Sequence, residues 1–307
     1  MRKTCLNCIY DIAREHEDVF FVGSDLGYKT LDDFKEEMPD RFFMEGISEQ
    51  HVIGMAAGLA MEGKTVYVNT IATFLTRRCF DQTAMDLCLH NVPVRLVGNG
   101  GGMVYAPLGP THMAIEDIAI MRALPNMTVV APCDAEEMAR FMPQTVDWEG
   151  PIYIRLGKGY DPVVSKPELG FTLGKGIPYR EGKDVLLVST GVSLHGCIDA
   201  ADLLAEKGVS AAIMHSPTIK PFDDELLLSM ADGVKAVVPV EEHTVIGGLG
   251  DAVGAALLAS GRTSLPAFRK VGIPDVFTEN YGSQKELMRH FGMDGEGIAK
   301  TVMDLIA

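Results

Sequence analysis

Glu49 is the residue whose position in this sequence most directly indicates chemistry. It follows Ser48, which can cap a helix that we expect over residues 48–62, so its carboxylate falls at a helix N-terminus. Taken alone, an acidic residue in a first helical turn usually does no more than compensate the helix dipole. The helix also carries small residues at positions 54, 56, 57, 58 and 60, which suit close packing against another subunit.

An aromatic and basic group follows in the next segment. Phe74, Arg77 and Phe80 stand three and six residues apart, so a single helix would bring them roughly to one face. Further along, His112 ends the sequence Gly-Pro-Thr-His. By itself a phenylalanine usually packs in a core and a loop histidine usually bonds to backbone. These residues therefore need a wider context before a role can be given to them.

Five stretches of sequence supply that context, because they match one family in order. They are GISEQHVIGMAAGLA (46–60), IATFLTRRCFDQ (71–82), GPTH (109–112), LPNMTVVAPCDAEE (124–137) and VPVEEHTVIGGLGDAV (238–253). The first four resemble the pyrimidine-binding domain of transketolases and 1-deoxyxylulose-5-phosphate synthases, and the last resembles their C-terminal domain. The resemblance covers nearly the whole chain. It implies a transferase subunit that uses thiamine diphosphate to move a two-carbon ketol unit between sugar or sugar-phosphate substrates.

Glu49 matches the family's glutamate that hydrogen-bonds N1′ of the cofactor's aminopyrimidine. A carboxyl group at N1′ favours the imino tautomer, whose N4′ nitrogen can take the C2 proton of the thiazolium. Two effects on the pKa of Glu49 oppose each other, because a helix N-terminus lowers it and burial against a ring raises it. The sequence leaves open which effect is larger.

The resemblance also implies roles for the other candidates. Phe74 matches the aromatic residue that stacks on the pyrimidine, and Arg77 and Phe80 fall where the family places neighbouring ring contacts. Asp25 matches an aspartate near the thiazolium. His112 matches a histidine that reaches the donor's carbonyl or first hydroxyl, so it is carried over as both catalytic and substrate-binding.

The substrate itself stays open. Arg2 and Lys158 align with family arginines that hold the substrate phosphate, and Lys29 falls where another polar contact lies. Lysine can hold an anion as a point charge. However, Gly100 replaces a substrate-contacting histidine, and Leu108 replaces an aspartate that recognises a donor hydroxyl. The loop 98–112 is therefore where this chain departs most, and its sugar could carry phosphate, sulfonate or neither.

The motif that would bind the cofactor's diphosphate is missing. The family uses Gly-Asp-Gly with a downstream asparagine to hold a divalent metal, and the nearest approximation here is Gly250-Asp251-Ala252 with Asn280 beyond it. We reject it because the third glycine is alanine and Asp251 falls in an apparently helical stretch. We therefore expect a partner subunit to carry the motif and the metal, Mg²⁺ or Ca²⁺, in an α2β2 heterotetramer. The chain itself is expected to hold no metal.

Two other functions compete with this interpretation. The β-subunit of a 2-oxo acid dehydrogenase is also a two-domain chain with the same Ser-Glu-Gln sequence, although TFLTRRCFDQ and GPTH favour transketolase. A non-catalytic chain of the same fold is the second alternative, and the presence of Glu49, Phe74 and His112 speaks against it.

The elements that must position these residues alternate along the chain. Apolar runs typical of buried strands occupy 18–25, 65–70, 92–99, 127–132, 151–156, 184–190, 210–216, 235–242 and 267–273. Helical patterns lie near 4–16, 48–62, 78–90, 134–146, 193–207, 247–260, 283–292 and 296–307. The alternation predicts an α/β fold with two domains, each a mostly parallel sheet with helices on both faces. We expect a pyrimidine-binding domain over 1–165, a linker over 166–183 and a C-terminal domain over 184–307.

Composition limits the remaining possibilities. The 307 residues carry a net charge of −15, which argues against nucleic acid as a partner. We expect neither a membrane span nor a secretory signal, and so a cytoplasmic enzyme. Cys5 and Cys8 form a CxxC pair, but they lie in an amphipathic stretch, so core packing is the preferred interpretation.

Overall fold

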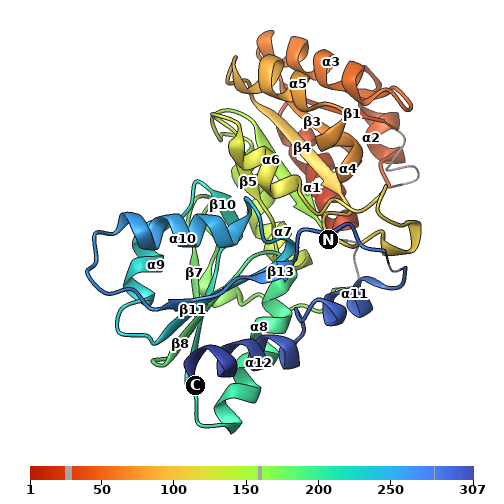
Figure 1. Ribbon diagram of the computed structural model, residues 1–307. Helices are drawn as coiled ribbons and strands as arrows, with labels where there is room; N and C mark the ends of the chain where they lie inside the picture. The colour runs from red at the N-terminus through yellow and green to blue at the C-terminus, as the bar shows by residue number, and fades with distance from the viewer. Residues whose placement is uncertain (25–29, 158–160, 280) are drawn as a thin grey trace.

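The computed structural model describes residues 1–24, 30–157, 161–279 and 281–307, which form two α/β domains around two separate sheets (Figure 1). Most of the pairing within both sheets is parallel, and helices lie on both faces of each. The expected fold class is therefore confirmed. Asp25, Lys29, Lys158 and Asn280, which the sequence analysis named, lie outside the described residues.

The first sheet has its strands in the order β10-β5-β6-β4-β3-β1-β2. They are β1 (Val19–Gly23), β2 (Phe42–Met44), β3 (Thr65–Ile71), β4 (Val94–Asn99), β5 (Thr128–Val130), β6 (Ile152–Leu156) and β10 (Thr218–Lys220). Neighbouring strands are parallel except β10, which runs antiparallel to β5. All residues of β4 and β6 are buried, because a parallel sheet covered on both faces has no solvent side.

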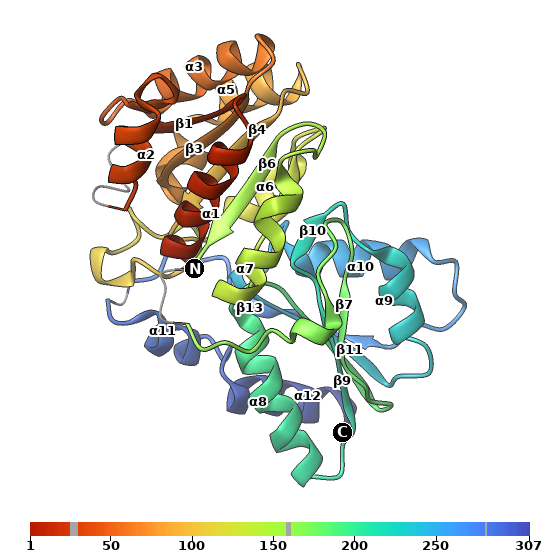
Figure 2. The same ribbon diagram turned by 180° about the vertical axis from the view of Figure 1, so that it is seen from behind.

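Helices cover the two faces of this sheet. They are α1 (Arg2–Glu15), α2 (Asp32–Glu37), α3 (Glu49–Met61), α4 (Ala72–Arg77), α5 (Phe80–Gln82), α6 (Asp117–Ala123) and α7 (Ala135–Phe141). Successive strand residues point to opposite faces, so Tyr67 packs with α1 and α7 whereas Val66 and Val68 pack with α3, α4 and α6. Figure 2 shows α1 and α7 together on one side of the sheet.

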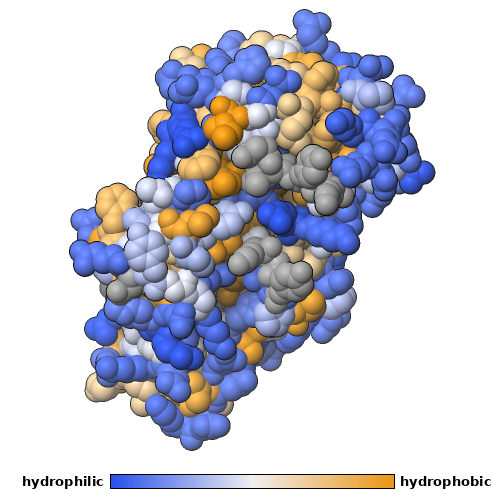
Figure 3. All heavy atoms as spheres, turned by 90° about the vertical axis from the view of Figure 1, so that its right-hand side faces the viewer, coloured by the Kyte–Doolittle hydropathy of each residue, from blue (hydrophilic) through white to orange (hydrophobic). Residues whose placement is uncertain are grey.

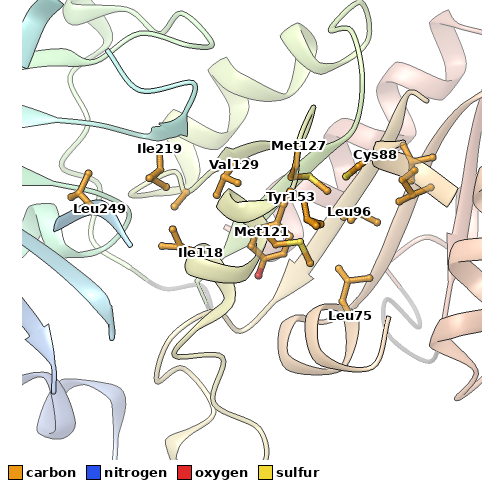
Figure 4. Packing of buried hydrophobic residues seen from close by; sticks show 14 of the residues in the cluster. Leu75, Cys88, Leu96, Ile118, Met121, Met127, Val129, Tyr153, Ile219 and Leu249 are labelled. Atoms are coloured by element: carbon orange, nitrogen blue, oxygen red, sulfur yellow. The ribbon is translucent and has the colours of Figure 1, made fainter. Parts of the chain in front are cut away.

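The core beneath α3, α4 and α6 continues into the second domain. It joins Leu75, Leu96 and Tyr153 of the first domain to Ile219 and Leu249 of the second half of the chain (Figure 4). The two domains thus share buried apolar surface, which stabilises their relative placement.

The second sheet has the strand order β12-β11-β8-β9-β7, with β13 also paired to β11. Its strands are β7 (Ile177–Arg180), β8 (Val185–Ser189), β9 (Ala211–His215), β11 (Ala236–Thr244), β12 (Ala267–Phe268) and β13 (Val271–Ile273). Its helices are α8 (Ser193–Glu206), α9 (Asp224–Met230), α10 (Leu249–Ala259), α11 (Gln284–His290) and α12 (Gly295–Ile306). Strand β7 lies inside residues 166–183, so part of the stretch expected to be a linker belongs to this sheet.

A buried ion pair also joins the domains. The Nε atom of Arg155 on β6 donates to Asp117 Oδ2 at 2.8 Å, and its Nη2 donates to the carbonyl oxygen of Glu242 on β11 at 2.8 Å. Tyr153 donates to the same Asp117 oxygen at 2.6 Å. Removing one member of such a pair leaves a buried charge without a partner, which is strongly destabilising.

Asp134 caps α7, since its carboxylate accepts from the Glu137 backbone N–H at 2.9 Å. Two local predictions can also be compared with the structure. Ser48 does precede α3, but its hydroxyl donates to the carbonyl of Glu45 at 2.9 Å, so the predicted side-chain cap is wrong. Cys5 is buried in the core under α1, as the packing interpretation required.

The face shown in Figure 3 is largely hydrophilic, because blue residues predominate there and apolar residues form small separate groups. Within the described part of the chain, no helix has the length and apolar character needed to cross a bilayer.

Candidate active site

Glu49 is the first residue of α3 and its side chain is only 5% exposed. It contributes to a shallow pocket lined by residues 47–51 and Arg78. Arg78 Nη1 donates to Glu49 Oε2 at 3.2 Å, and Gln50 Nε2 donates to the backbone carbonyl of Arg78 at 2.9 Å. Burial raises the pKa of the neighbouring Cys79 thiol to about 12, and the Glu49 carboxylate contributes to that rise. That thiol is therefore neutral, and the charged groups facing each other here are Glu49 and Arg78.

Phe74 lies on α4, directly after β3, and is partly exposed. The guanidinium carbon of Arg78 is 3.9 Å from the centre of its ring, which is a close cation–π contact. The His112 ring meets Phe74 edge-on, with 5.2 Å between ring centres and 67° between planes. The structure therefore brings Glu49, Phe74 and His112 into one connected group, with Arg78 in contact with the first two.

His112 is held in place by its own loop. Its backbone N–H donates to the carbonyl of Gly109 at 3.0 Å, and its Nδ1 lies 2.9 Å from the hydroxyl of Thr111. Because Nδ1 is engaged with Thr111, Nε2 is the ring nitrogen left for a substrate.

The predicted grouping of Phe74, Arg77 and Phe80 on one helical face is not found. Helix α4 ends at Arg77 and α5 begins at Phe80, so no single helix joins them. Arg77 makes a bidentate ion pair with Glu116 and donates to the carbonyl of Met113 at 3.0 Å. Hydrogen bonding to Glu116 raises the pKa of Arg77 above its usual value. Arg77 thus fixes the segment after His112, and Phe80 is 37% exposed on the next helix.

The loop before His112 is fixed from the second domain. The Glu242 carboxylate accepts from the Met103 backbone N–H at 2.7 Å and from Gln284 Nε2 at 2.9 Å. Burial raises the pKa of Glu242 to about 7. At Gly100 the backbone has φ +75°, and a Cβ there would collide with the ring of Tyr105. A larger residue at position 100 would therefore require the Tyr105 ring to move.

The three basic residues expected at a substrate phosphate are only partly described. Arg2 is exposed and is the first residue of α1. The neighbouring Met1 packs against Gly157, whose Cβ, if present, would lie 2.7 Å from the Met1 methyl carbon. The start of α1 therefore lies beside the residue that precedes Lys158 in the chain. Leu108, where the family carries an aspartate, is 55% exposed at the end of a 3-10 turn.

A buried polar cluster that the sequence analysis did not name lies at the domain junction. Cys133, Glu137 and His215 could in principle hold a metal ion. However, His215 Nε2 is 3.1 Å from Glu137 Oε2, its Nδ1 is 3.0 Å from the Ser189 hydroxyl, and Glu137 accepts from the Cys133 N–H at 2.7 Å. Burial alone would raise the pKa of Glu137, but His215 and these bonds lower it. The cluster is therefore best described as a polar connection between the domains.

Comparison with known proteins places the chain. The family model described as transketolase, pyrimidine binding domain, matches residues 1–160, and the model described as transketolase, C-terminal domain, matches residues 174–298. The chain belongs to the transketolase family. The family assigned from the sequence motifs is therefore confirmed.

Individual relatives of this transketolase-family chain are similar over nearly its full length. A Phocaeicola vulgatus protein, named as one of the subunits of an apulose-4-phosphate transketolase, is 35% identical and is matched over 99% of this chain and 97% of its own. A Clostridium protein, named as a 6-deoxy-6-sulfo-D-fructose transketolase subunit, is 33% identical over 99% and 94%. A solved structure titled split gene transketolase, inactive beta4 tetramer, matches with a TM-score of 0.90 at 35% identity, covering 99% of this chain and 97% of that one.

Thiamine diphosphate, which the family implies, fits part of this site. An aminopyrimidine needs a carboxylate for a ring nitrogen and an aromatic face for stacking. Glu49 offers a buried carboxylate, and Phe74 offers a ring face, on which the planar guanidinium of Arg78 lies. The diphosphate does not find a comparable place at Asp251. This residue lies in α10, and its carboxylate accepts from the Gly247 N–H and from Lys270 Nζ. The described residues therefore fit the aminopyrimidine half of the cofactor.

Proposed function

We propose that this chain is the subunit of a two-chain, thiamine-diphosphate-dependent transketolase that carries the aminopyrimidine half of the cofactor site. The enzyme transfers a two-carbon ketol unit from a ketose donor to an aldose acceptor. The observation that carries the proposal is the connected group of Glu49, Phe74 and His112, drawn from three separate segments of the first domain. The names of the related subunits support it, since both are transketolase subunits of nearly the same length.

Each residue of the group has a distinct task in this proposal. When bound, thiamine diphosphate supplies a carbon nucleophile and an electron sink for the ketol unit. Glu49 binds the ring nitrogen N1′ and holds a proton there, so its carboxyl group tunes the basicity of the aminopyrimidine. Phe74 orients the ring by stacking, with Arg77, Phe80 and Asp25 near the remaining ring contacts. His112 directs its Nε2 toward the donor's carbonyl or first hydroxyl.

The rest of the active site is divided between the two subunits. A partner subunit supplies the diphosphate site and its divalent metal, Mg²⁺ or Ca²⁺, and two copies of each chain form an α2β2 heterotetramer in the cytoplasm. Arg2, Lys29 and Lys158 form the site for an anionic group of the substrate. The relatives' names include both a sugar phosphate and a sulfonated sugar, so phosphate and sulfonate are the anions to test first.

Reconstitution tests the proposal. The purified chain alone should bind thiamine diphosphate weakly and show no turnover, and mixing it with the partner subunit should create both binding and ketol transfer. Ketol transfer is measured with a ketose donor and an aldose acceptor, in parallel with oxidation of a 2-oxo acid by an artificial electron acceptor. Turnover by the single chain would refute the split site. Oxidation of 2-oxo acids without ketol transfer would assign a dehydrogenase subunit instead.

A further inference from the structure

Arg78 makes two contacts at once, and they involve the two groups assigned to the cofactor ring. Its Nη1 donates to the Glu49 carboxylate at 3.2 Å, and its guanidinium lies 3.9 Å from the centre of the Phe74 ring. The side chain is 48% exposed, so it reaches this position from solvent and is not packed into the core. Arg78 has no role in the proposed function.

The chemistry of these contacts resembles that of the cofactor ring. A guanidinium is planar, delocalised and positively charged, and it donates N–H groups in its own plane. An aminopyrimidine bound between Glu49 and Phe74 needs the same two partners, a ring face for stacking and a carboxylate for a ring nitrogen. Both groups cannot stack on the same face of Phe74 while using the same carboxylate oxygen.

We propose that Arg78 occupies the aminopyrimidine position in the cofactor-free chain and is displaced when thiamine diphosphate binds. The inference rests on the proposed function, because it takes Glu49 and Phe74 as the cofactor's partners. Arg78 then supplies the counter-charge for the buried Glu49 carboxylate until the cofactor replaces it. Cofactor loading is a competition between the ring and a side chain of the same protein.

The Arg78 side chain is less firmly held than that of its neighbour Arg77. Arg77 is bound to Glu116 and to the Met113 carbonyl, which together fix its guanidinium. In contrast, among the described residues the Arg78 guanidinium contacts Glu49 and Phe74, both at the proposed site. Its backbone is separately held, because the Arg78 carbonyl accepts from Gln50 Nε2 at 2.9 Å. The side chain can therefore leave without disturbing the turn between α4 and α5.

The loss of cofactor affinity that Arg78 causes can be worked out from its two contacts. A partly exposed ion pair and a partly exposed cation–π contact are each weak. Together they would reduce cofactor affinity by about 3- to 30-fold. A reduction of this size disfavours cofactor binding to the chain before the partner subunit joins it. The contacts that the partner subunit makes with the diphosphate are then sufficient for the cofactor to displace Arg78.

The experiment titrates thiamine diphosphate with Mg²⁺ into the complex of this chain with its partner subunit, followed by calorimetry. Arg78→Ala should bind the cofactor about 3- to 30-fold more tightly than wild type. Arg14→Ala is a matched control, because Arg14 on α1 makes the same two kinds of contact. Its Nε lies 3.9 Å from Glu37 Oε2, and its guanidinium carbon lies 5.7 Å from the centre of the Tyr10 ring. The cofactor affinity of Arg14→Ala should equal that of wild type. Arg78→Gln repeats the test should the alanine variant fold poorly.

Free guanidinium should compete with the cofactor for the position that the missing Arg78 side chain leaves. Adding guanidinium chloride at a non-denaturing concentration should therefore weaken cofactor binding to Arg78→Ala more than an equal concentration of sodium chloride does.

Glu49→Gln and Phe74→Ala separate failure of the displacement proposal from failure of the proposed function. If both weaken binding while Arg78→Ala binds no more tightly than wild type, the proposed function stands and the displacement proposal is refuted. If neither variant changes cofactor affinity, the proposed site itself is wrong, and the displacement proposal fails with it.

Discussion

Replacing Glu49 with glutamine separates a catalytic from a structural role for this carboxyl group. Glutamine keeps the size and one acceptor oxygen for Arg78, but it cannot hold a proton at the cofactor's N1′. Turnover should fall by about 10²–10⁴-fold, the range typical of lost acid–base catalysis, which corresponds to about 3–5 kcal/mol in the activation barrier. Folding should change much less. The variant weakens an ion pair whose arginine is 48% exposed, about 0.2–1 kcal/mol, and loses a helix-terminus contribution of about 0.3–1 kcal/mol.

The decisive assay is exchange of the C2 proton of bound thiamine diphosphate, followed by NMR in the reconstituted complex. Denaturant unfolding of the same variant supplies the stability change. Glu296→Gln is a suitable control, because Glu296 is an exposed acid in the first turn of α12 and should lose only the helix-terminus contribution. If Glu49→Gln exchanges the C2 proton as fast as wild type, Glu49 is simply a carboxylate at a helix terminus, and the assignment of the site is wrong.

Three further changes test other parts of the site. Phe74→Ala should reduce cofactor affinity by about 2- to 12-fold through lost stacking alone, measured by calorimetry; a collapse of thermal stability with normal affinity would make Phe74 a core residue. Lys158→Ala should raise the Michaelis constant for a phosphorylated acceptor and spare a neutral one, and an equal effect on both would remove Lys158 from the anion site. Glu242→Gln tests the buried carboxyl group whose pKa is raised to about 7. Between its unfolded pKa and 7 the folded wild type binds the extra proton, so its stability falls as pH rises. The glutamine variant should therefore gain about 2–3 kcal/mol relative to wild type between about pH 5 and pH 8 in denaturant unfolding, and a constant difference would contradict the shift.

Most of the architecture could be predicted from the sequence because it rests on long apolar runs. Strands such as β3 and β11 and helices such as α8 and α12 have enough residues to show their periodicity. The missed elements are short or set by distant partners. Strands β2 and β10 have three residues each, and β10 is a strand only because β5 offers it an edge. Strand β7 was hidden in a stretch rich in glycine, proline and charge.

The site was predicted through family motifs, and the structure adds what motifs could not give. Glu49, Phe74 and His112 were named from the sequence, and they are found together. Arg78 was missed because two adjacent arginines look alike in sequence. Which of them faces Glu49 depends on the break after Arg77, where α4 ends. The hydrogen bond from the Met103 N–H, in the loop before His112, to Glu242 joins residues 139 positions apart. No local sequence pattern predicts a contact between residues so far apart in the chain.

The position of β10 has a consequence for synthesis of the protein. This strand, Thr218–Lys220, covers the edge of β5 in the first sheet, yet it is translated after β8 and β9 of the second sheet. While the ribosome makes the intervening segment, the first domain exposes a bare strand edge that could pair with another nascent chain. A gene division or a chimera made between the two domains would leave that edge permanently open unless residues 218–220 were kept with the first domain.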